Sequence, residues 1–364
     1  MSRVVLSGYY GFNNAGDEAI LYAIIHTLRK IEPGMEITVL SHDPAKTAKQ
    51  YNVRAVRRWK PGEVAKALRA CDLLISGGGS LLQDVTSKLS PLYYLGVMLM
   101  AKLLGKTVMV YAQGIGPLKT KINRALASFV LNRVDAITVR DQRSKEDLLA
   151  MGVERAVEVT ADPVLGLSPE TISLERGREI LERHGLCKKE GEKLLGVYIR
   201  SWKNNAYLPE LVKACDRLAE EGWKIVFVPM QFPGDIAVSR QAAKQMKHEA
   251  AVLKEMYSPE EILSIMKNMD LVIGMRLHAL IKGAVAGAPV VGLSYDPKVD
   301  RFLEQIGQQA LLSVDDLSSE TLWEMVNWAY SRRGELGKDL QNRLSPLYQK
   351  AWRNARIALE LLNK

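Results

Sequence analysis

The sequence has little cysteine: three residues in a chain of 364, at Cys71, Cys187 and Cys215. An odd number of cysteines at such wide spacing predicts neither a disulfide framework nor a zinc site. Sparse cysteine is typical of proteins that work in a reducing compartment. We therefore expect a cytoplasmic protein without a bound metal.

A long apolar run is also missing. The longest spans residues 91–101 and ends at Lys102, which is too short to cross a bilayer. Residues 1–6 lead directly into an expected strand, so no signal peptide is expected. These absences exclude a membrane span and leave contact with a membrane surface open.

The chain has the composition of a globular protein, with 47% hydrophobic and 25% charged residues. Its length predicts about two domains. The 50 basic and 41 acidic residues give a net charge of +9, which directs attention to anionic partners: nucleic acid, a membrane face, or a substrate carrying phosphate or carboxylate. The basic residues are scattered, however, and only Arg54, Arg57, Arg58 and Lys60 form a short cluster.

Short apolar runs alternate with longer segments of helical period, the pattern of an α/β fold with parallel sheets. The expected strands span residues 4–7, 36–40, 73–76, 107–111 and 136–140 in the first half and 194–199, 223–228, 271–274, 290–293 and 310–312 in the second. The charged stretch 167–193 contains no apolar strand. We therefore expect domains at residues 1–168 and 169–335, with a C-terminal helix at 336–364 that packs back on the first domain.

Two segments, one in each half, match each other. Residues 72–82 (DLLISGGGSLL) and 270–280 (DLVIGMRLHAL) each predict a buried strand, a tight loop and the start of a helix. The match favours two similar sheets facing each other, although shared β-α-β geometry alone is an alternative explanation.

The segment after the first strand, residues 8–19, combines glycines with aromatic and polar side chains and opens a helix. Glycine lets a ligand approach the backbone, and a helix N-terminus offers free N–H groups to an anion. The segment matches no nucleotide fingerprint. We interpret it as a binding loop with Asn13, Asn14 and Asp17 as candidate ligands. The alternative is an ordinary turn capped by Asn14 or Asp17.

Three glycines follow the strand at 73–76, within the sequence SGGGSLLQD. Such a run is costly unless the backbone turns sharply or leaves room for a ligand. Gly78, Ser80 and Asp84 are therefore candidate binding residues. For Asp84 the equal alternative is a carboxylate in the first helical turn, favoured by the helix dipole.

Further polar side chains follow other expected strands. Gln113 opens the sequence QGIGP, and Arg140 ends the strand at 136–140. Loops at the carboxyl ends of parallel strands are where α/β folds bind ligands. Both residues are therefore candidates, with surface ion pairing as the alternative for Arg140.

The sharpest pattern is GMRLH at residues 274–278. Arg276 and His278 are two positions apart across a strand-to-helix turn, and Lys298 follows the next strand. Arginine binds carboxylate or phosphate by two parallel hydrogen bonds, and histidine transfers protons near neutral pH. The three cations predict a site for a small, highly charged anion.

In this order, the segments resemble the polysaccharide pyruvyltransferases, most closely the bacterial CsaB type. The resemblance rests on residues 8–18, 76–80, 111–117, 139–141, 161–163 and 274–279. It implies two Rossmann-like domains in the GT-B arrangement, with the active site in the cleft between them. It also implies transfer of pyruvate from phosphoenolpyruvate to a sugar, which forms a 4,6-ketal and releases phosphate.

For the CsaB type, the implied acceptor is N-acetylmannosamine in a lipid-linked precursor of a secondary cell-wall polymer that anchors the S-layer. The first domain is then the acceptor side and the second the donor side. By resemblance, Arg276 and His278 match the donor-binding and acid positions, and Lys298 and Arg140 match further anion ligands. Asp84 and Asp17 are candidate bases. Phosphoenolpyruvate is the co-substrate, and no other cofactor or metal is implied.

Two rival functions fit parts of the pattern. A GT-B glycosyltransferase with a nucleotide-sugar donor is the alternative enzyme, and Glu261 is its candidate ribose ligand. A nucleic-acid-binding protein is suggested only by the net charge, and no recognition motif supports it; we expect no nucleic-acid partner.

A cluster around Trp59, made of Arg57, Arg58 and Lys60, is a candidate contact with the inner face of the cell membrane. An ordinary exposed cluster is the alternative. The sequence leaves the oligomeric state open.

Overall fold

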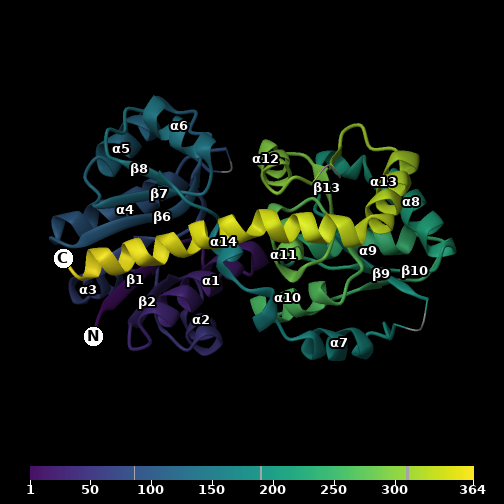
Figure 1. The fold of residues 1–364 in the computed structure, drawn as a ribbon. Helices are drawn as coiled ribbons and strands as arrows, with labels where there is room; N and C mark the ends of the chain where they lie inside the picture. Colours follow the sequence, from purple (N-terminus) through teal and green to yellow (C-terminus); the bar gives the residue numbers. More distant parts are fainter. Residues whose placement is uncertain (86, 189–190, 309–310) are drawn as a thin grey trace. The chain divides into compact units, whose positions relative to one another are not determined.

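The computed structural model describes residues 1–85, 87–188, 191–308 and 311–364. The chain divides into two compact units, Met1–Gly166 with Leu347–Lys364, and Leu167–Pro346. Figure 1 colours the units along the sequence. The first unit ends at Gly166, two residues before the domain boundary predicted at residue 168. The chain re-enters this unit at Leu347, inside a C-terminal helix that begins at Arg333 and not at the predicted residue 336.

The first unit contains an eight-stranded sheet in the order β3-β2-β1-β4-β6-β7-β8, with β5 paired to β6. All pairs are parallel. The strands are β1 (Arg3–Ser7), β2 (Glu36–Ser41), β3 (Arg54–Arg57), β4 (Leu73–Ser76), β5 (Gly79–Leu82), β6 (Thr107–Ile115), β7 (Ala136–Val139) and β8 (Val157–Val159). The helices are α1 (Ala15–Ile31), α2 (Pro44–Tyr51), α3 (Pro61–Ala70), α4 (Ser90–Leu103), α5 (Lys121–Leu131), α6 (Gln142–Ala150) and the last part of α14 (Arg333–Leu362).

The second unit contains a six-stranded parallel sheet in the order β11-β10-β9-β12-β13-β14. Its strands are β9 (Lys193–Tyr198), β10 (Trp223–Phe227), β11 (Ala250–Val252), β12 (Leu271–Gly274), β13 (Val290–Ser294) and β14 (Leu311–Ser313). Its helices are α7 (Leu174–Arg183), α8 (Leu208–Glu220), α9 (Gly234–Gln245), α10 (Pro259–Lys267), α11 (Leu277–Ala286), α12 (Pro297–Gln305) and α13 (Ser319–Ser331). The predicted α/β class with two Rossmann-like units is confirmed.

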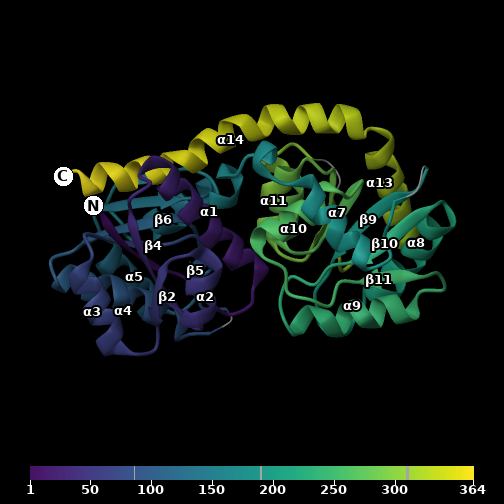
Figure 2. The same ribbon diagram turned by 90° about the horizontal axis from the view of Figure 1, so that it is seen from below.

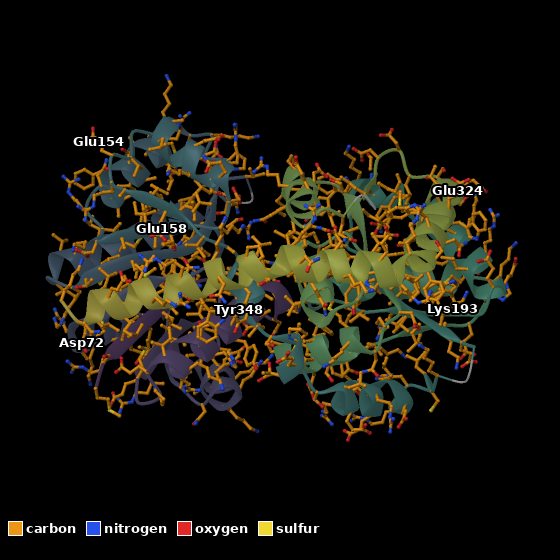
Figure 3. The ribbon with its side chains drawn as sticks, viewed as in Figure 1. Asp72, Glu154, Glu158, Lys193, Glu324 and Tyr348 are labelled. Atoms are coloured by element: carbon orange, nitrogen blue, oxygen red, sulfur yellow. The ribbon has the colours of Figure 1, made fainter. Side chains whose placement is uncertain are left out.

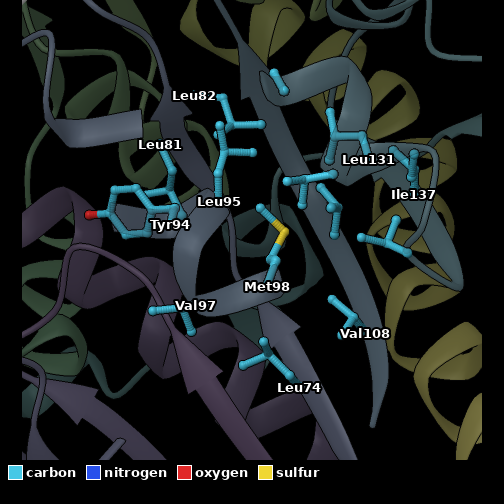
Figure 4. Close-up of a cluster of buried hydrophobic side chains, with 14 of the residues drawn as sticks. Leu74, Leu81, Leu82, Tyr94, Leu95, Val97, Met98, Val108, Leu131 and Ile137 are labelled. Carbon is cyan, nitrogen blue, oxygen red and sulfur yellow. The ribbon is translucent and has the colours of Figure 1, made fainter. Parts of the chain in front are cut away.

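Helices cover the sheets because the strands are apolar on both faces. In the first unit, Leu95 and Met98 of α4 pack with Leu74 of β4 and Val108 of β6, all fully buried (Figure 4). Burying one such side chain contributes about 1.5–3 kcal/mol. The continuous apolar runs that predict these strands are therefore also what holds the helices on the sheet.

Four strands were not predicted: β3, β5, β8 and β11. β3 contains Arg54 and Arg57 of the basic cluster, and its exposed and half-buried residues give no apolar run. β5 lies where the sequence analysis expects a helix near Ser80, and α4 begins only at Ser90. The strand expected at 310–312 corresponds to β14, although residue 310 lies outside the described residues.

The two matching segments occupy the same place in both sheets. β4 pairs with β1, and β12 pairs with β9, the first strand of its unit. The Asp72 carboxylate (labelled in Figure 3) accepts the N–H of Arg3 at 2.9 Å. The Asp270 carboxylate accepts the N–H of Leu194 at 2.8 Å. Each aspartate fixes the start of the neighbouring strand, so the match reflects one position in two similar sheets.

The last part of α14 is tied to the first unit by buried polar contacts. Asn354 is fully buried, and its Oδ1 accepts the hydroxyls of Thr138 and Thr160 at 2.6 and 2.8 Å. Arg353 pairs at 3.0 Å with Glu158 of β8, which lies beside α14 in Figure 3. Figure 2 shows the helix along this unit from below.

None of the helices in the described ranges is long and apolar enough to cross a bilayer.

We expect Asn354→Leu to destabilise the first unit, because it preserves side-chain volume but removes the nearer acceptor of two buried hydroxyls, which are then left with the Val110 and Val139 carbonyls at 3.2 Å. One net hydrogen bond contributes about 0.5–1.5 kcal/mol, so the free energy of unfolding should fall by about 1–3 kcal/mol in urea titrations. The control is Asn342→Leu, an exposed position on the same helix. Equal stability of the two variants would contradict the assignment.

Candidate functional site

The candidate residues of each unit lie where its parallel strands end. Carboxyl ends of parallel strands share one edge of a sheet, and ligands of α/β folds bind there. In the second unit the relevant loops follow β9, β10, β12 and β13, which are neighbours or next neighbours in the sheet. In the first unit they follow β1 and β4 to β7. Each unit therefore has its own candidate region.

Arg276 is the most firmly held cation of the second unit. It is the N-cap of α11, immediately after β12 and Met275. Its Nε and Nη2 donate to the two carboxylate oxygens of Asp235 at 2.6 and 2.5 Å, and Nη2 also donates to Gln231 at 3.0 Å. The Asp235 side chain is only 2% exposed. This two-pronged pair fixes the guanidinium plane, so Arg276 meets a ligand in one orientation.

His278 lies in the first turn of α11 and is partly exposed. Lys282 follows one turn later and is fully buried, with its Nζ 3.8 Å from the Sδ of Met230. Burial lowers the pKa of Lys282 to about 7. Residues four apart share a helix face, so the imidazole and the buried amine lie on the same side of α11.

Lys298 belongs to a group of cations around Tyr295. Its Nζ lies 3.0 Å from Asp296 Oδ2 and 5.7 Å from the centre of the Tyr295 ring. Arg200, just after β9, donates to the Tyr295 hydroxyl at 2.9 Å. Among the described residues no carboxylate pairs with Arg200, whereas Arg276 and Lys298 each have one. Arg200 therefore carries excess positive charge at this edge.

Tyr207 lies next to Arg200, which belongs to the group of cations around Tyr295. Its hydroxyl donates to the Arg200 carbonyl at 2.7 Å. Burial raises the pKa of Tyr207, the Asp235 carboxylate raises it further, and the Arg200 and Arg276 guanidiniums lower it. The predicted Arg276 and Lys298 follow the paired strands β12 and β13, and with Arg200 they make this edge of the second unit cationic.

Three residues of this region were not predicted as site residues from the sequence: Arg200, Gln231 and Asp235. Arg200 directly follows an expected strand, so the rule that selects Arg276 could also have selected it. Asp235 lies in the first turn of α9, where a carboxylate is common and carries no distinctive signal. Within the part of the chain that the structure describes, no group of three or more His, Cys, Asp or Glu residues is placed to hold a metal.

In the first unit, the glycine run is packed against the first loop. Tyr10 is buried, and a Cβ on Gly77 would lie 2.3 Å from its hydroxyl oxygen. Gly79 has a φ of +89°, and the Asp17 carboxylate lies 3.2 Å from where its Cβ would be. Gly78 is also buried, against a side chain of α1 at 3.1 Å. The run therefore meets needs of packing and conformation that only glycine satisfies, and Asp17 lies over it.

Arg140 and Ser80, two predicted binding residues, are in contact. The buried Arg140 donates to Asp162 Oδ2 and to Ser80 Oγ, both at 3.1 Å. A Cβ on Gly114 would lie 2.6 Å from the guanidinium, so this glycine lets Arg140 lie over the backbone. The ion pair is buried, and the alternative of a surface pair is wrong.

The first loop also borders a pocket of about 650 Å³. Asn13 lines it together with His42 and Arg57. Asn13 has a φ of +58°, and its Oδ1 accepts Lys46 Nζ at 2.7 Å. Asn14 caps α1 by accepting a backbone N–H at 3.0 Å. The structure thus gives Asn14 the capping role and places Asn13 at the pocket.

Two other candidates are engaged inside the fold. Gln113 is fully buried, and its amide donates to the Ser76 hydroxyl at 2.8 Å. The Glu261 carboxylate accepts the N–H of Ser258 at 2.9 Å and Arg176 Nη2 at 2.6 Å. Burial raises the pKa of Glu261, but these hydrogen bonds outweigh it and leave the pKa below its ordinary value. Both residues therefore have structural partners.

The sequence predicts that Arg58 belongs to an exposed basic cluster, and this prediction is wrong. It is only 4% exposed. Its guanidinium carbon lies 4.2 Å from the centre of the Tyr93 ring and 4.9 Å from that of Trp59, and Nη1 donates to the Gly8 carbonyl at 2.6 Å. Arg58 therefore holds the backbone of the loop after β1 in place and is not available to a membrane.

Asp84 joins two loops of the first unit. Its carboxylate accepts the N–H groups of Lys119 and Thr120 at 2.7 and 2.9 Å, the Thr120 hydroxyl at 2.8 Å and the Asn123 amide at 3.2 Å. Burial raises its pKa, but the four hydrogen bonds together hold the pKa well below its usual range. It does not lie in a first helical turn, since residues 79–82 form β5. Its contacts give Asp84 a structural role.

Comparison with known proteins identifies one family and several similar folds. The family model described as "Polysaccharide pyruvyl transferase" matches residues 14–297. The amylovoran biosynthesis protein AmsJ of Erwinia amylovora is 21% identical over 385 residues, which cover 89% of this chain and 91% of that protein.

Two solved structures share the fold. HepE from Anabaena, in complex with UDP-glucose, matches with a TM-score of 0.68 and 14% identity over 100% of both chains. A putative UDP-N-acetylglucosamine 2-epimerase from Listeria monocytogenes matches with a TM-score of 0.66 and 13% identity, over 98% of this chain and 94% of that one. At these identities the likeness establishes the fold alone, and it confirms the predicted GT-B class.

We expect Asp84→Asn to lower the free energy of unfolding by about 2 kcal/mol at pH 7, because it removes a charged acceptor of four hydrogen bonds. The folded-state pKa of Asp84 is depressed, so its stabilisation is present above the ordinary pKa of about 3.9 and is lost as the pH falls below that value. The difference between wild type and variant should therefore shrink below about pH 4. The control is Asp316→Asn at an exposed position, and a difference that stays constant down to pH 2 would speak against this role.

Proposed function

The chain belongs to the polysaccharide pyruvyl transferase family, and we propose that it transfers pyruvate from phosphoenolpyruvate to two hydroxyls of a sugar, forming a 4,6-ketal and releasing phosphate. The observation that carries the proposal is the cationic region of the second unit. There, Arg276 is fixed by a buried carboxylate, Arg200 pairs with none in the described ranges, and His278 lies on the adjoining helix turn. Phosphoenolpyruvate has about three negative charges and needs several such cations.

The reaction balances with one proton donor and one proton acceptor. His278 protonates the methylene carbon, which becomes a methyl group, and the neighbouring carbon C2 becomes electrophilic. One sugar hydroxyl bonds to C2 and loses its proton; the C2–O bond to phosphate then breaks, and its electron pair leaves with phosphate. The second hydroxyl bonds to C2 and closes the ring. The two hydroxyl protons restore His278 and protonate the released phosphate.

Several cations bind the donor together. Arg276, Arg200 and Lys298 bind the carboxylate and phosphate groups of phosphoenolpyruvate, and Asp235 keeps the Arg276 guanidinium in place. Lys298 lies on a helix N-terminus, which further favours an anion. In the first unit, the buried Arg140 orients Ser80 at the glycine loop.

The first unit is the acceptor side in this proposal. Its pocket of about 650 Å³ beside Asn13 has room for a sugar. We propose a lipid-linked amino-sugar acceptor, N-acetylmannosamine in a precursor of a secondary cell-wall polymer. The similarity to AmsJ, an amylovoran biosynthesis protein, supports a role in glycan assembly. Of the two candidate bases we favour Asp17, which lies over Gly79, because Asp84 already accepts four hydrogen bonds.

The alternative function is a GT-B glycosyltransferase with a nucleotide-sugar donor, because the similar structures include complexes with UDP-glucose. The two functions differ in the donor that they consume.

We expect the protein to release phosphate from phosphoenolpyruvate when a lipid-linked N-acetylmannosamine acceptor is present, and to do so in EDTA. Phosphate release and the mass gain of the acceptor are measured together. UDP-glucose and UDP-N-acetylglucosamine serve as matched donors. Transfer from a UDP-sugar with none from phosphoenolpyruvate would favour the glycosyltransferase, and loss of turnover in EDTA with recovery on adding a divalent ion would contradict the metal-free reaction.

We expect His278→Gln to lower kcat by about 10²–10⁴-fold with little change in donor affinity, because glutamine retains a hydrogen-bond donor but delivers no proton at neutral pH. Arg276→Ala and Lys298→Ala should instead weaken phosphoenolpyruvate binding about ten- to a hundredfold, since each removes a charge-assisted bond. Lys338→Ala, an exposed cation on α14, is the control, and every variant must keep the wild-type melting temperature. Wild-type kcat in a folded His278→Gln protein would remove His278 from the chemistry.

A further inference from the structure

Three strongly exposed aliphatic side chains lie on the first unit, outside the site described above. Val85 and Leu89, on the segment between β5 and α4, are 58% and 72% exposed, and Ile122 in the first turn of α5 is 77% exposed. α4 and α5 pack together (Figure 2). Isolated exposed aliphatic residues are ordinary, so the position of these three relative to one another decides their meaning.

Hydrogen bonds bring together the two segments that carry these side chains. Asp84, next to Val85, accepts from the Asn123 amide at 3.2 Å, and Asn123 is the neighbour of Ile122. The same amide donates to the carbonyl of Lys88, the neighbour of Leu89, at 3.2 Å. Asn123 thus holds the β5–α4 segment against the start of α5.

The exposed charges of these two segments have one sign. Lys88, Lys119 and Lys121 are exposed and lie among the three aliphatic residues in the sequence of the two loops. In the described ranges none of them pairs with a carboxylate, whereas lysines elsewhere do, such as Lys60 with Glu63. The two adjoining segments thus present three exposed aliphatic side chains and three lysines that pair with no described carboxylate.

We propose that this face, formed by Val85, Leu89 and Ile122 with Lys88, Lys119 and Lys121, binds an anionic membrane surface. Aliphatic side chains enter the boundary between headgroups and acyl chains, while the lysines extend to the lipid phosphates. A protein partner would be expected to use a larger contiguous apolar area. The surface lies at the edge of the sheet that carries the loops after β5 and β6. Its proposed role is the same whichever sugar is the acceptor.

This surface replaces the cluster around Trp59 as the membrane contact. Arg58 is buried among aromatic rings, and Lys60 pairs with Glu63 at 3.6 Å. Trp59 is exposed but packs against Tyr93, with ring centres 5.1 Å apart. Within the described residues, no carboxylate pairs with the three lysines of the new face.

The test is co-sedimentation of the full chain with phosphatidylcholine vesicles, with and without about one third phosphatidylglycerol. The wild type should bind the anionic vesicles and release them as salt is raised, because exposed charges are screened. A triple variant, Lys88→Gln with Lys119→Gln and Lys121→Gln, should bind about a hundredfold more weakly, at about fivefold for each lysine. The double variant Leu89→Ser with Ile122→Ser should bind more than tenfold more weakly, because two apolar contacts are lost.

Two matched controls separate this face from general charge. Lys244→Gln with Lys247→Gln and Lys338→Gln removes the same net charge from exposed positions of the second unit and should bind within about threefold of wild type. Arg57→Gln with Lys60→Gln tests the cluster around Trp59 and should also bind like wild type. Unchanged binding in the two face variants, or equal loss in either control, overturns the proposal. All variants must keep the wild-type circular dichroism and melting temperature.

Discussion

Parallel pairing is the constraint on which the rest of this molecule depends. When every strand of a sheet runs the same way, the residues that follow the strands have one edge to share, however distant they are in sequence. Arg200, Asp235 and Arg276 follow three such strands, and Asp235 and Arg276 are in direct contact. Asp72 and Asp270 fix the register of the central strand pairs. A slip of one residue there would turn the side chains at the site to the opposite face.

The elements that the sequence predicts are those whose signal is local. Buried strands such as β4 and β12 are continuous apolar runs, and Arg276 follows one of them directly. Asp84 shows where local reasoning fails: helical spacing places it near Ser80, but pairing of β5 with β6 extends the chain there. Asp235 is missed because its role comes only from its contact with Arg276, 41 residues away in sequence. No single-residue pattern contains that contact.

Largely buried cations recur in this fold, and they are held in two different ways. Arg276 and Arg140 pair with buried carboxylates, whereas Arg58 lies among aromatic rings and donates to a backbone carbonyl. Burying an ion pair costs several kcal/mol of desolvation, which its attraction offsets only with good geometry. Such pairs are therefore weak sources of stability. Their value here is positional: they fix the guanidinium of Arg276, the loop after β1 and the side chain of Ser80.

The return of α14 to the first unit sets the order in which the chain can fold during synthesis. Residues 1–166 leave the ribosome first, yet Asn354, the side-chain acceptor of the Thr138 and Thr160 hydroxyls, follows only about two hundred residues later. The second unit, Leu167–Pro346, is contiguous in sequence and needs no later segment. The unit that is made first is thus completed last, and until then its sheet exposes a surface on which a chaperone can act.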